Sequence, residues 1–323
     1  MRILITGAGG FIGSHLVRAL LSAGQLTDRH GASRRIDRML LVDSYLPTCS
    51  DNRVERILGD ISDDAVLRRI ADWQPDSVFH LAAMLTSAAA KEPDRALHVN
   101  VSALAQLIGM VGSQTVPPKF IFPSSIAVFG GVLPDTVGDD LVQHPQTSYG
   151  THKSIAELML ADAARRGEIE GRSLRLPIVL VHPGPPTSSV SDRIAAIVRD
   201  AVAGHDVIVP LNSETRIPVA SVSAVVAGLI AMHNVPSTTL NGATAINLPA
   251  LTVSMADIVA ALERTVDSSR LGKITLAPDM ALESIVDGWP KGFVSQTASA
   301  AGISGDETFE GIVRHYIASL GNA

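Results

Sequence analysis

Short runs of aliphatic residues alternate with stretches of helical periodicity through the first half of the chain. The first pair is a strand over Arg2–Thr6 followed by a helix over Phe11–Ala23, in which Leu16 and Leu20 recur at helical spacing. The same alternation predicts further strands over Arg38–Val42, Ser77–Leu81, Lys119–Pro123 and Leu174–Val181, and further helices over Asp63–Trp73, Leu97–Val111 and Ser148–Arg166.

This order of elements predicts an α/β fold built on a doubly wound parallel Rossmann sheet with helices on both faces. The strands are apolar without strict alternation, as expected of strands that are buried on both sides. After Pro177 the regular alternation of strands and helices changes. A turn is expected at 183–186, and helices then alternate with short strands. We therefore expect a Rossmann domain over 1–176, to which part of about 214–248 returns. A smaller C-terminal substrate-binding domain is expected over 177–213 and 249–323.

Composition and charge narrow the class of function. Of the 323 residues 46% are apolar and 18% are charged, and the net charge of −6 is scattered without a basic run. A small-molecule substrate is therefore favoured over nucleic acid or a membrane surface. The longest apolar stretch, Val219–Met232, is interrupted by Ser221 and Gly228 and is too short to span a bilayer. With Cys49 as the single cysteine and no zinc-like spacing, we expect a soluble cytoplasmic protein without a metal site.

A glycine-rich segment lies between the first predicted strand and helix. Gly7, Gly10 and Gly13 form a G-x-x-G-x-x-G pattern, in which Gly7 permits a tight turn, Gly10 lets the backbone approach a pyrophosphate, and Gly13 lets helix and strand pack closely. The helix that follows offers N–H groups and a positive dipole end to phosphates. A tight turn without a ligand is the alternative. The position between strand and helix favours a dinucleotide site.

Asp43 ends the next strand and bears on the choice of cofactor. A carboxylate there accepts hydrogen bonds from ribose hydroxyls and repels a 2′-phosphate, so NAD is favoured over NADP. An N-cap or a surface aspartate is the alternative, and Arg34, Arg35 and Arg38 keep NADP open. Asp60 could reach the adenine amino group.

Tyr149 and Lys153 lie four residues apart and therefore on one face of a predicted helix. A free phenol has a pKa near 10, and a cation within ~4–6 Å is expected to lower it by about one to three units. Lys153 could supply that charge and also hold the nicotinamide ribose, while Ser125, at the end of a strand, could fix the substrate oxygen. The alternative is a surface pair without a role. A serine hydrolase is disfavoured because Ser125 lacks the G-x-S-x-G elbow.

Together these motifs resemble the extended short-chain dehydrogenase/reductases of the NAD-dependent epimerase/dehydratase family. The similarity runs along almost the whole chain and is most specific in the first 180 residues. It implies a catalytic triad of Ser125, Tyr149 and Lys153. It also implies cofactor contacts, besides Tyr149 and Lys153, from the following residues: Gly7, Gly10, Phe11, Ile12, Gly13, Asp43, Asp60, Ile61, Leu81, Ala82, Ala83, Asn100, Pro177 and Ile178. Asn100 could equally be an ordinary helix residue.

The second half departs from the nucleotide-sugar enzymes of that family. The stretch after Arg175 lacks the Asn and Tyr of those enzymes, and the stretch after Arg216 lacks their Asp and His. The segments 145–150, 174–177, 247–249 and 288–290 instead resemble the D-erythronate dehydrogenase branch. That resemblance implies NAD-dependent oxidation of the C2 hydroxyl of a four-carbon sugar acid to the 2-oxo acid.

Three further residues are candidates for binding the substrate. The planar guanidinium of Arg216 suits bidentate capture of a carboxylate, although a structural arginine is an equal alternative. Thr86 and Ser87 could touch substrate hydroxyls, and helix capping would explain them as well.

Two other functions remain open. A nucleotide-sugar 4-epimerase or dehydratase would keep NAD tightly bound and regenerate it, and a non-catalytic regulator would sense NAD. By analogy with relatives, the helices over Leu97–Val111 and Ser148–Arg166 could form a homodimer.

Overall fold

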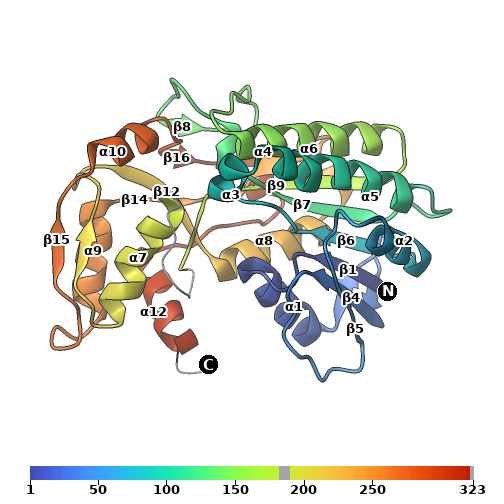
Figure 1. Cartoon of the computed structure of the whole chain (residues 1–323), viewed down its shortest axis with the longest axis horizontal. Coiled ribbons are helices and arrows are strands. Elements are labelled where there is room, and N and C mark those ends of the chain that lie inside the picture. The colour runs from blue at the N-terminus through green and yellow to red at the C-terminus, as the bar shows by residue number, and fades with distance from the viewer. Residues whose placement is uncertain (182–189, 321–323) are drawn as a thin grey trace.

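A computed structural model describes residues 1–181 and 190–320, and over these residues the largest sheet has seven strands, all parallel. The turn expected at 183–186 lies outside the described residues. The strand order is β13-β9-β7-β6-β1-β4-β5 (Figure 1). The order reverses between β1 and β6, which is the position at which doubly wound sheets bind ligands. The strands are β1 (Arg2–Thr6), β4 (Arg38–Asp43), β5 (Val54–Leu58), β6 (Ser77–His80), β7 (Lys119–Ser125), β9 (Glu170–Leu176) and β13 (Ala245–Asn247).

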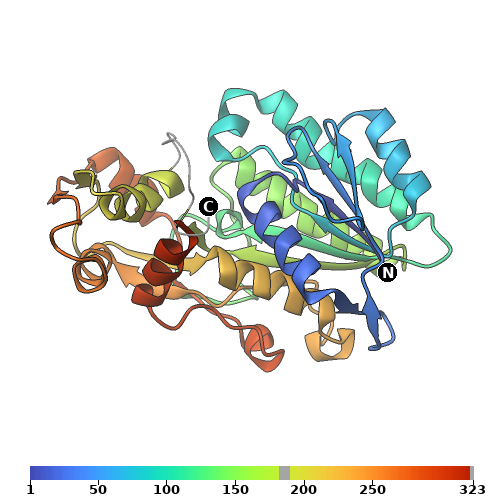
Figure 2. The same cartoon turned by 90° about the horizontal axis from the view of Figure 1, so that it is seen from below.

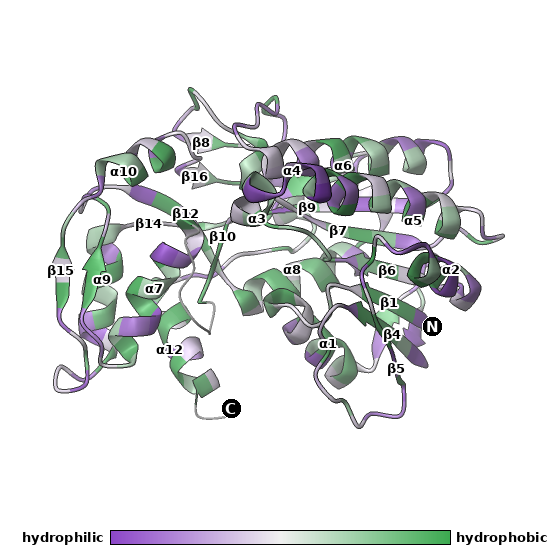
Figure 3. Cartoon of the chain, in the orientation of Figure 1, coloured by the Kyte–Doolittle hydropathy of each residue, from purple (hydrophilic) through white to green (hydrophobic). Residues whose placement is uncertain are grey.

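Helices cover both faces of this sheet, as the predicted fold class requires (Figures 1 and 2). On one face α1 (Phe11–Ala23) packs beside α8 (Val222–Asn234), and on the other α2 (Asp64–Trp73), α5 (Ala103–Gly112) and α6 (Ser148–Arg165) lie side by side. Each face has its own apolar core, with Leu16 and Leu229 in one and Leu107 and Leu160 in the other. In the hydropathy colouring β7 and α8 are mostly apolar, whereas α4 is largely hydrophilic (Figure 3).

The strand predicted over Leu174–Val181 is wrong as a single element. The chain leaves the large sheet at the end of β9, and β10 (Ile178–Leu180) begins a separate three-stranded sheet with β12 (Arg216–Ser221) and β14 (Leu251–Ser254). Pro177 stands between the two strands, where its missing N–H interrupts the ladder. Strand β5 was not predicted because it is an edge strand with a single buried residue, Ile57, and therefore shows no clear hydrophobic pattern.

The helix predicted over Leu97–Val111 is divided. It comprises the end of α4 (Pro93–Leu97), a π-helical turn η1 (His98–Ser102) and α5. A π-turn inserts an extra residue into the helix and is common at functional sites. Asn100 lies in this turn, so the one-face periodicity assumed for the helix does not hold there.

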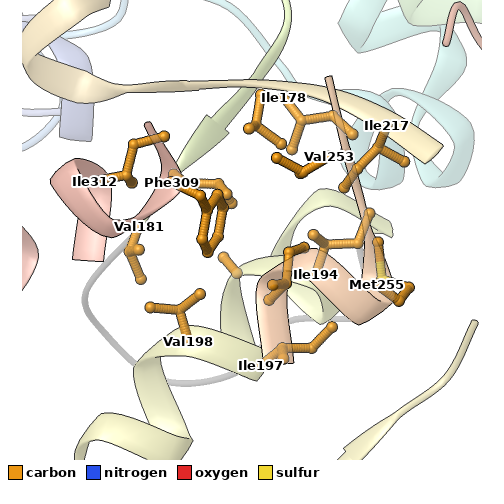
Figure 4. Packing of buried hydrophobic residues seen from close by; sticks show 14 of the residues in the cluster. Ile178, Val181, Ile194, Ile197, Val198, Ile217, Val253, Met255, Phe309 and Ile312 are labelled. Atoms are coloured by element: carbon orange, nitrogen blue, oxygen red, sulfur yellow. The ribbon is translucent and has the colours of Figure 1, made fainter. Parts of the chain in front are cut away.

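The second half of the chain builds a smaller layer beside the sheet, with its own core (Figures 1 and 4). Side chains from β10, α7 (Val190–Val202), β14 and α12 (Phe309–Leu320) surround Phe309, among them Ile178, Val198 and Val253. Helix α8 and strand β13 return to the large sheet, whereas β12 does not. The domain boundaries stay a prediction. No helix among the described residues is long and apolar enough to cross a membrane.

The remaining elements are mostly short. Two strands form a hairpin within the stretch between α1 and β4, and four others pair in two small parallel ladders. They are β2 (Gln25–Thr27), β3 (Ser33–Arg35), β8 (Thr136–Val137), β11 (Val207–Val209), β15 (Ile274–Leu276), β16 (Gly292–Phe293), α3 (Thr86–Lys91), η2 (Ile126–Val128), α7 (Val190–Val202), η3 (Ser237–Leu240), α9 (Met255–Thr265), α10 (Met280–Asp287), α11 (Gln296–Ala300) and α12 (Phe309–Leu320).

Candidate active site

The glycine loop joins β1 to α1 beside the reversal of strand order. Gly7 has φ +69°, and a Cβ atom there would lie 2.6 Å from the backbone nitrogen of Ala82. A Cβ on Gly13 would lie 2.1 Å from the Gly7 carbonyl oxygen, so these two positions need glycine for the protein's own packing. A Cβ on Gly10 would meet only that same oxygen, at 3.3 Å. Of the three glycines of the pattern, Gly10 is thus the one whose missing side chain is least required by packing within the protein. This fits a position at which a pyrophosphate approaches the backbone.

Asp43 ends β4 and is bound to this loop. Its Oδ2 accepts the Gly9 N–H at 2.9 Å, and its Oδ1 accepts the Tyr45 N–H at 3.3 Å. Gly9, which the sequence pattern did not single out, is held so closely that an added Cβ would lie 1.8 Å from the Tyr45 carbonyl oxygen. The carboxylate therefore lies at the glycine loop, in the place expected for a ribose contact.

The segments after β5 and β6 supply the other predicted cofactor residues. Asp60 accepts hydrogen bonds from the backbone and side chain of Ser62, and Ile61 is buried. Leu81 continues from β6 with its N–H bonded to the Thr6 carbonyl, and the Ala82 N–H lies 3.3 Å from the Thr6 hydroxyl. Small side chains at Ala82 and Ala83 leave this segment close to the glycine loop.

Asn100 secures the same segment from the other side. Its Oδ1 accepts the Met84 N–H at 2.7 Å, and its Nδ2 donates to the Met84 carbonyl at 2.9 Å. The amide is buried and pairs with a different segment of the chain, and a contact of Asn100 with the cofactor stays a prediction.

Ser125 and Tyr149 meet at the carboxyl end of β7. Ser125 is the last residue of β7 and caps the short helix η2 by accepting the Ala127 N–H at 3.2 Å. Tyr149 lies in the first turn of α6, which Thr147 caps through its hydroxyl. The side chain of Ser125 acts on the phenol of Tyr149 and lowers its pKa, so two of the three predicted catalytic residues lie together.

The expected lowering of the tyrosine pKa is wrong for this structure. Burial raises the pKa of Tyr149 to about 12, and the hydrogen bond from Ser125 only partly offsets it. Lys153 is buried, and its Nζ donates a hydrogen bond to the Pro123 carbonyl at 2.7 Å. The same Nζ lies 4.1 Å from the ring centre of Phe122 and 5.6 Å from the ring centre of Tyr149. The ammonium is thus directed at a backbone oxygen, and desolvation dominates the titration of the phenol.

Burial also lowers the pKa of Lys153, to about 7, while the charge of Glu157 acts in the opposite direction. Glu157 lies one turn further along α6 and was not predicted. It is fully buried and takes hydrogen bonds from Arg175 at 2.8–3.1 Å. The spacing of four from Tyr149 to Lys153 and again to Glu157 is the signal that could have identified it.

The remaining predicted residues are placed differently from one another. Pro177 and Ile178 are buried where the chain passes from one sheet to the other. Arg216 is about half exposed and pairs with Asp135 at 3.4 Å. No hydrogen bond or ion pair among the described residues joins it to Ser125 or Tyr149.

Thr86 and Ser87 form the first turn of α3. That helix begins after Leu85 without a side-chain cap, so the capping explanation of these two hydroxyl groups does not apply.

The described residues fit a dinucleotide on the evidence of the loop itself. The backbone at Gly10 is open, the N-terminus of α1 follows it directly, and the Asp43 carboxylate stands at the loop. Helix N-termini of this kind favour phosphate groups.

Comparison with known proteins agrees with this arrangement. Residues 3–248 match the model of the NAD dependent epimerase/dehydratase family. A D-erythronate dehydrogenase from Cupriavidus necator is 36% identical and one from Haemophilus influenzae is 30% identical. These alignments cover 100% of this chain and 100% of the first relative, and 98% of this chain and 99% of the second.

Solved structures agree on the fold. A structure described as a nucleoside-diphosphate-sugar epimerase from Agrobacterium tumefaciens has a TM-score of 0.92 at 28% identity, covering 100% of this chain and 95% of that one. An L-threonine dehydrogenase from Cupriavidus necator has a TM-score of 0.86 at 24% identity, covering 99% and 100%. At that identity the second likeness concerns the fold alone.

Proposed function

The chain belongs to the NAD-dependent epimerase/dehydratase family and is an NAD-dependent oxidoreductase acting on CH–OH groups, and from this premise we propose that it oxidises a four-carbon sugar acid. The proposed substrate resembles D-erythronate, the C2 hydroxyl is the group oxidised, and the product is the 2-oxo acid. The observation that carries the proposal is the pairing of Ser125 with Tyr149 at the carboxyl end of β7, in a chain that aligns end to end with two D-erythronate dehydrogenases.

NAD, when bound, supplies the acceptor for the hydride that leaves C2. Tyr149 takes the C2 hydroxyl proton, and Ser125 donates a hydrogen bond to the same oxygen as it becomes a carbonyl. In the protein alone Tyr149 is a neutral phenol, which suits the reverse reaction, in which it returns the proton. The base role requires phenolate, and a protonated Lys153 favours that form.

The residues proposed to hold the cofactor are those of the glycine loop, Asp43, Asp60, Ile61, the segment 81–83, Asn100, Lys153, Pro177 and Ile178. The Asp43 carboxylate favours NAD over NADP because it would repel a 2′-phosphate. Thr86 and Ser87 are proposed to contact substrate hydroxyls. Arg216 remains a prediction as the partner of the substrate carboxylate, and it would have to exchange Asp135 for that carboxylate.

A nucleotide-sugar epimerase is the second candidate, because the solved structure with a TM-score of 0.92 carries that description. The two functions differ in their use of the cofactor, since an epimerase regenerates NAD in each cycle and a dehydrogenase releases NADH. Purified protein should therefore be supplied with NAD and erythronate, threonate or UDP-glucose, and absorbance at the NADH band followed. Steady NADH formation with erythronate is expected. Sugar epimerisation without net NADH would overturn the proposal.

A homodimer is also proposed, through α5 and α6. Leu158 on α6 is 69% exposed, and Leu97, at the end of α4 and before α5, is 46% exposed, so each leaves an apolar side chain uncovered. Light scattering on the full chain tests this, and a monomeric mass at micromolar concentration would contradict it.

A further inference from the structure

The Asn100 side chain pairs with both polar groups of the Met84 backbone, and this pairing fixes the direction of its amide. The oxygen has to face the Met84 N–H and the nitrogen has to face the Met84 carbonyl. Met84 lies in the irregular segment 81–85 between β6 and α3, and in the described part of the chain no other side chain hydrogen-bonds it. Asn100 therefore anchors the middle of that segment.

The second amide hydrogen of Asn100 is directed at His152. The distance from Asn100 Nδ2 to His152 Nδ1 is 3.3 Å, and both residues are buried. An amide nitrogen can only donate, so Nδ1 of the imidazole has to accept and the ring proton is on Nε2. Burial lowers the pKa of His152, in keeping with a neutral ring.

His152 also has a particular place in the chain. It precedes Lys153 on α6, and through Asn100 it is connected to the segment that carries Leu81, Ala82 and Ala83. We propose that His152 is a positioning residue: by accepting the second amide hydrogen of Asn100 it keeps that amide paired with Met84, and the pairing sets the segment 81–85 against the cofactor. This inference rests on the NAD site assigned under the proposed function, and does not depend on which sugar acid is oxidised.

The experiment compares a side chain that can accept a hydrogen bond from Asn100 at position 152 with one that cannot. In His152→Gln the side-chain oxygen can still accept the Asn100 hydrogen, whereas in His152→Leu it cannot. Ser154→Ala is the matched control, because Ser154 is a buried residue of the same helix whose hydroxyl has no hydrogen-bond partner among the residues that the structure describes. Affinity for NADH is measured by fluorescence titration without substrate, and KM for NAD and kcat are measured separately.

We expect His152→Leu to weaken NADH binding and raise KM for NAD about five- to tenfold, the scale of one buried hydrogen bond, with a smaller change in kcat. His152→Gln and Ser154→Ala should stay within about twofold of wild type. In an Asn100→Ala background, His152→Leu should have little additional effect, since the two residues act as a unit.

Three results would overturn the proposal. They are unchanged NADH affinity in His152→Leu with only a lower melting temperature, equal loss in His152→Gln and His152→Leu, or a full additional loss in the Asn100→Ala background. If the leucine variant does not fold, His152→Met replaces it. NADH binding is read without any sugar acid, so an inactive protein that binds NADH would refute the proposed substrate and leave this test intact.

Discussion

Arg175 and Glu157 form a buried ion pair one helical turn from Lys153. Nη2 and Nε of the guanidinium lie 2.8 and 3.0 Å from the two carboxylate oxygens, and Nη1 donates to the Asp139 carbonyl at 2.9 Å. The pair thereby ties α6, which carries Tyr149 and Lys153, to β9 and to the segment before α6.

Loss of Glu157 should therefore destabilise the whole protein. Glu157→Gln leaves the Arg175 charge buried without a counter-ion, and we expect the free energy of unfolding to fall by roughly 3–5 kcal/mol. Urea unfolding measures it. As a control, Asp287→Asn removes an exposed pair with Lys291 and should cost below about 1 kcal/mol. Equal effects of the two changes would contradict the importance of the buried pair.

Tyr149→Phe should separate binding from chemistry. The phenol ring stays in place but the proton acceptor is lost, so turnover should fall by about two to four orders of magnitude while NADH affinity remains nearly unchanged. Steady-state rates with erythronate and a fluorescence titration with NADH provide the two measurements. Turnover near that of wild type would remove Tyr149 from the mechanism.

The low pKa of Lys153 should appear in the pH dependence of stability. Its pKa is about 7 in the folded protein and near 10.5 when unfolded, so between these values the unfolded chain binds the proton and the folded protein does not. Stability should therefore rise with pH in this window, by up to about 1.4 kcal/mol per pH unit, and this contribution is constant below about pH 7. Tyr149 has a raised pKa and acts in the opposite sense, but only above about pH 10.

Urea unfolding of Lys153→Met without NAD, from about pH 7 to pH 9.5, measures this contribution by difference from wild type. The variant should lack the Lys153 part of the slope. Parallel curves for the two proteins would show that the ammonium is not desolvated.

The parts of the site that were predictable are those encoded locally. The glycine loop and the Tyr149–Lys153 spacing are short patterns, and the alternation of apolar runs determined the class of the sheet. The sequence marked Pro177 as a boundary between domains but not as a break in the strand, because both halves are apolar and only the tertiary structure assigns them to different sheets.

Side-chain contacts between residues far apart in the sequence could not be predicted either. Glu157 and Arg175 are charged residues that a pattern assigns to the surface, and Asn100 contacts Met84 and His152 from a π-helical turn that helical periodicity does not predict. The pKa of Tyr149 depends on the balance between burial and the direction of the Lys153 ammonium. The sequence shows that Lys153 is present but not the direction in which its ammonium points.

Two glycine substitutions test the cofactor loop in opposite ways. A Cβ on Gly13 would lie 2.1 Å from the Gly7 carbonyl oxygen, which is too close for two heavy atoms that are not bonded to each other. Gly13→Ala therefore has to displace the backbone. A Cβ on Gly10 would lie 3.3 Å from that oxygen, a tight but tolerable contact. We therefore expect Gly13→Ala to lower the melting temperature of the protein alone by several degrees, with weaker NADH binding as a consequence.

Gly10→Ala should impair NADH binding directly and leave the melting temperature of the protein alone nearly unchanged. The protein alone should melt close to wild type, since the methyl group meets only the Gly7 carbonyl oxygen among the described residues. NADH affinity should fall at least about tenfold, because the methyl group would hinder the approach of a pyrophosphate to the backbone. Differential scanning fluorimetry with and without NADH reads both quantities on the same samples. A Gly10→Ala protein that is stabilised by NADH as strongly as wild type would mean that the dinucleotide does not lie against this loop.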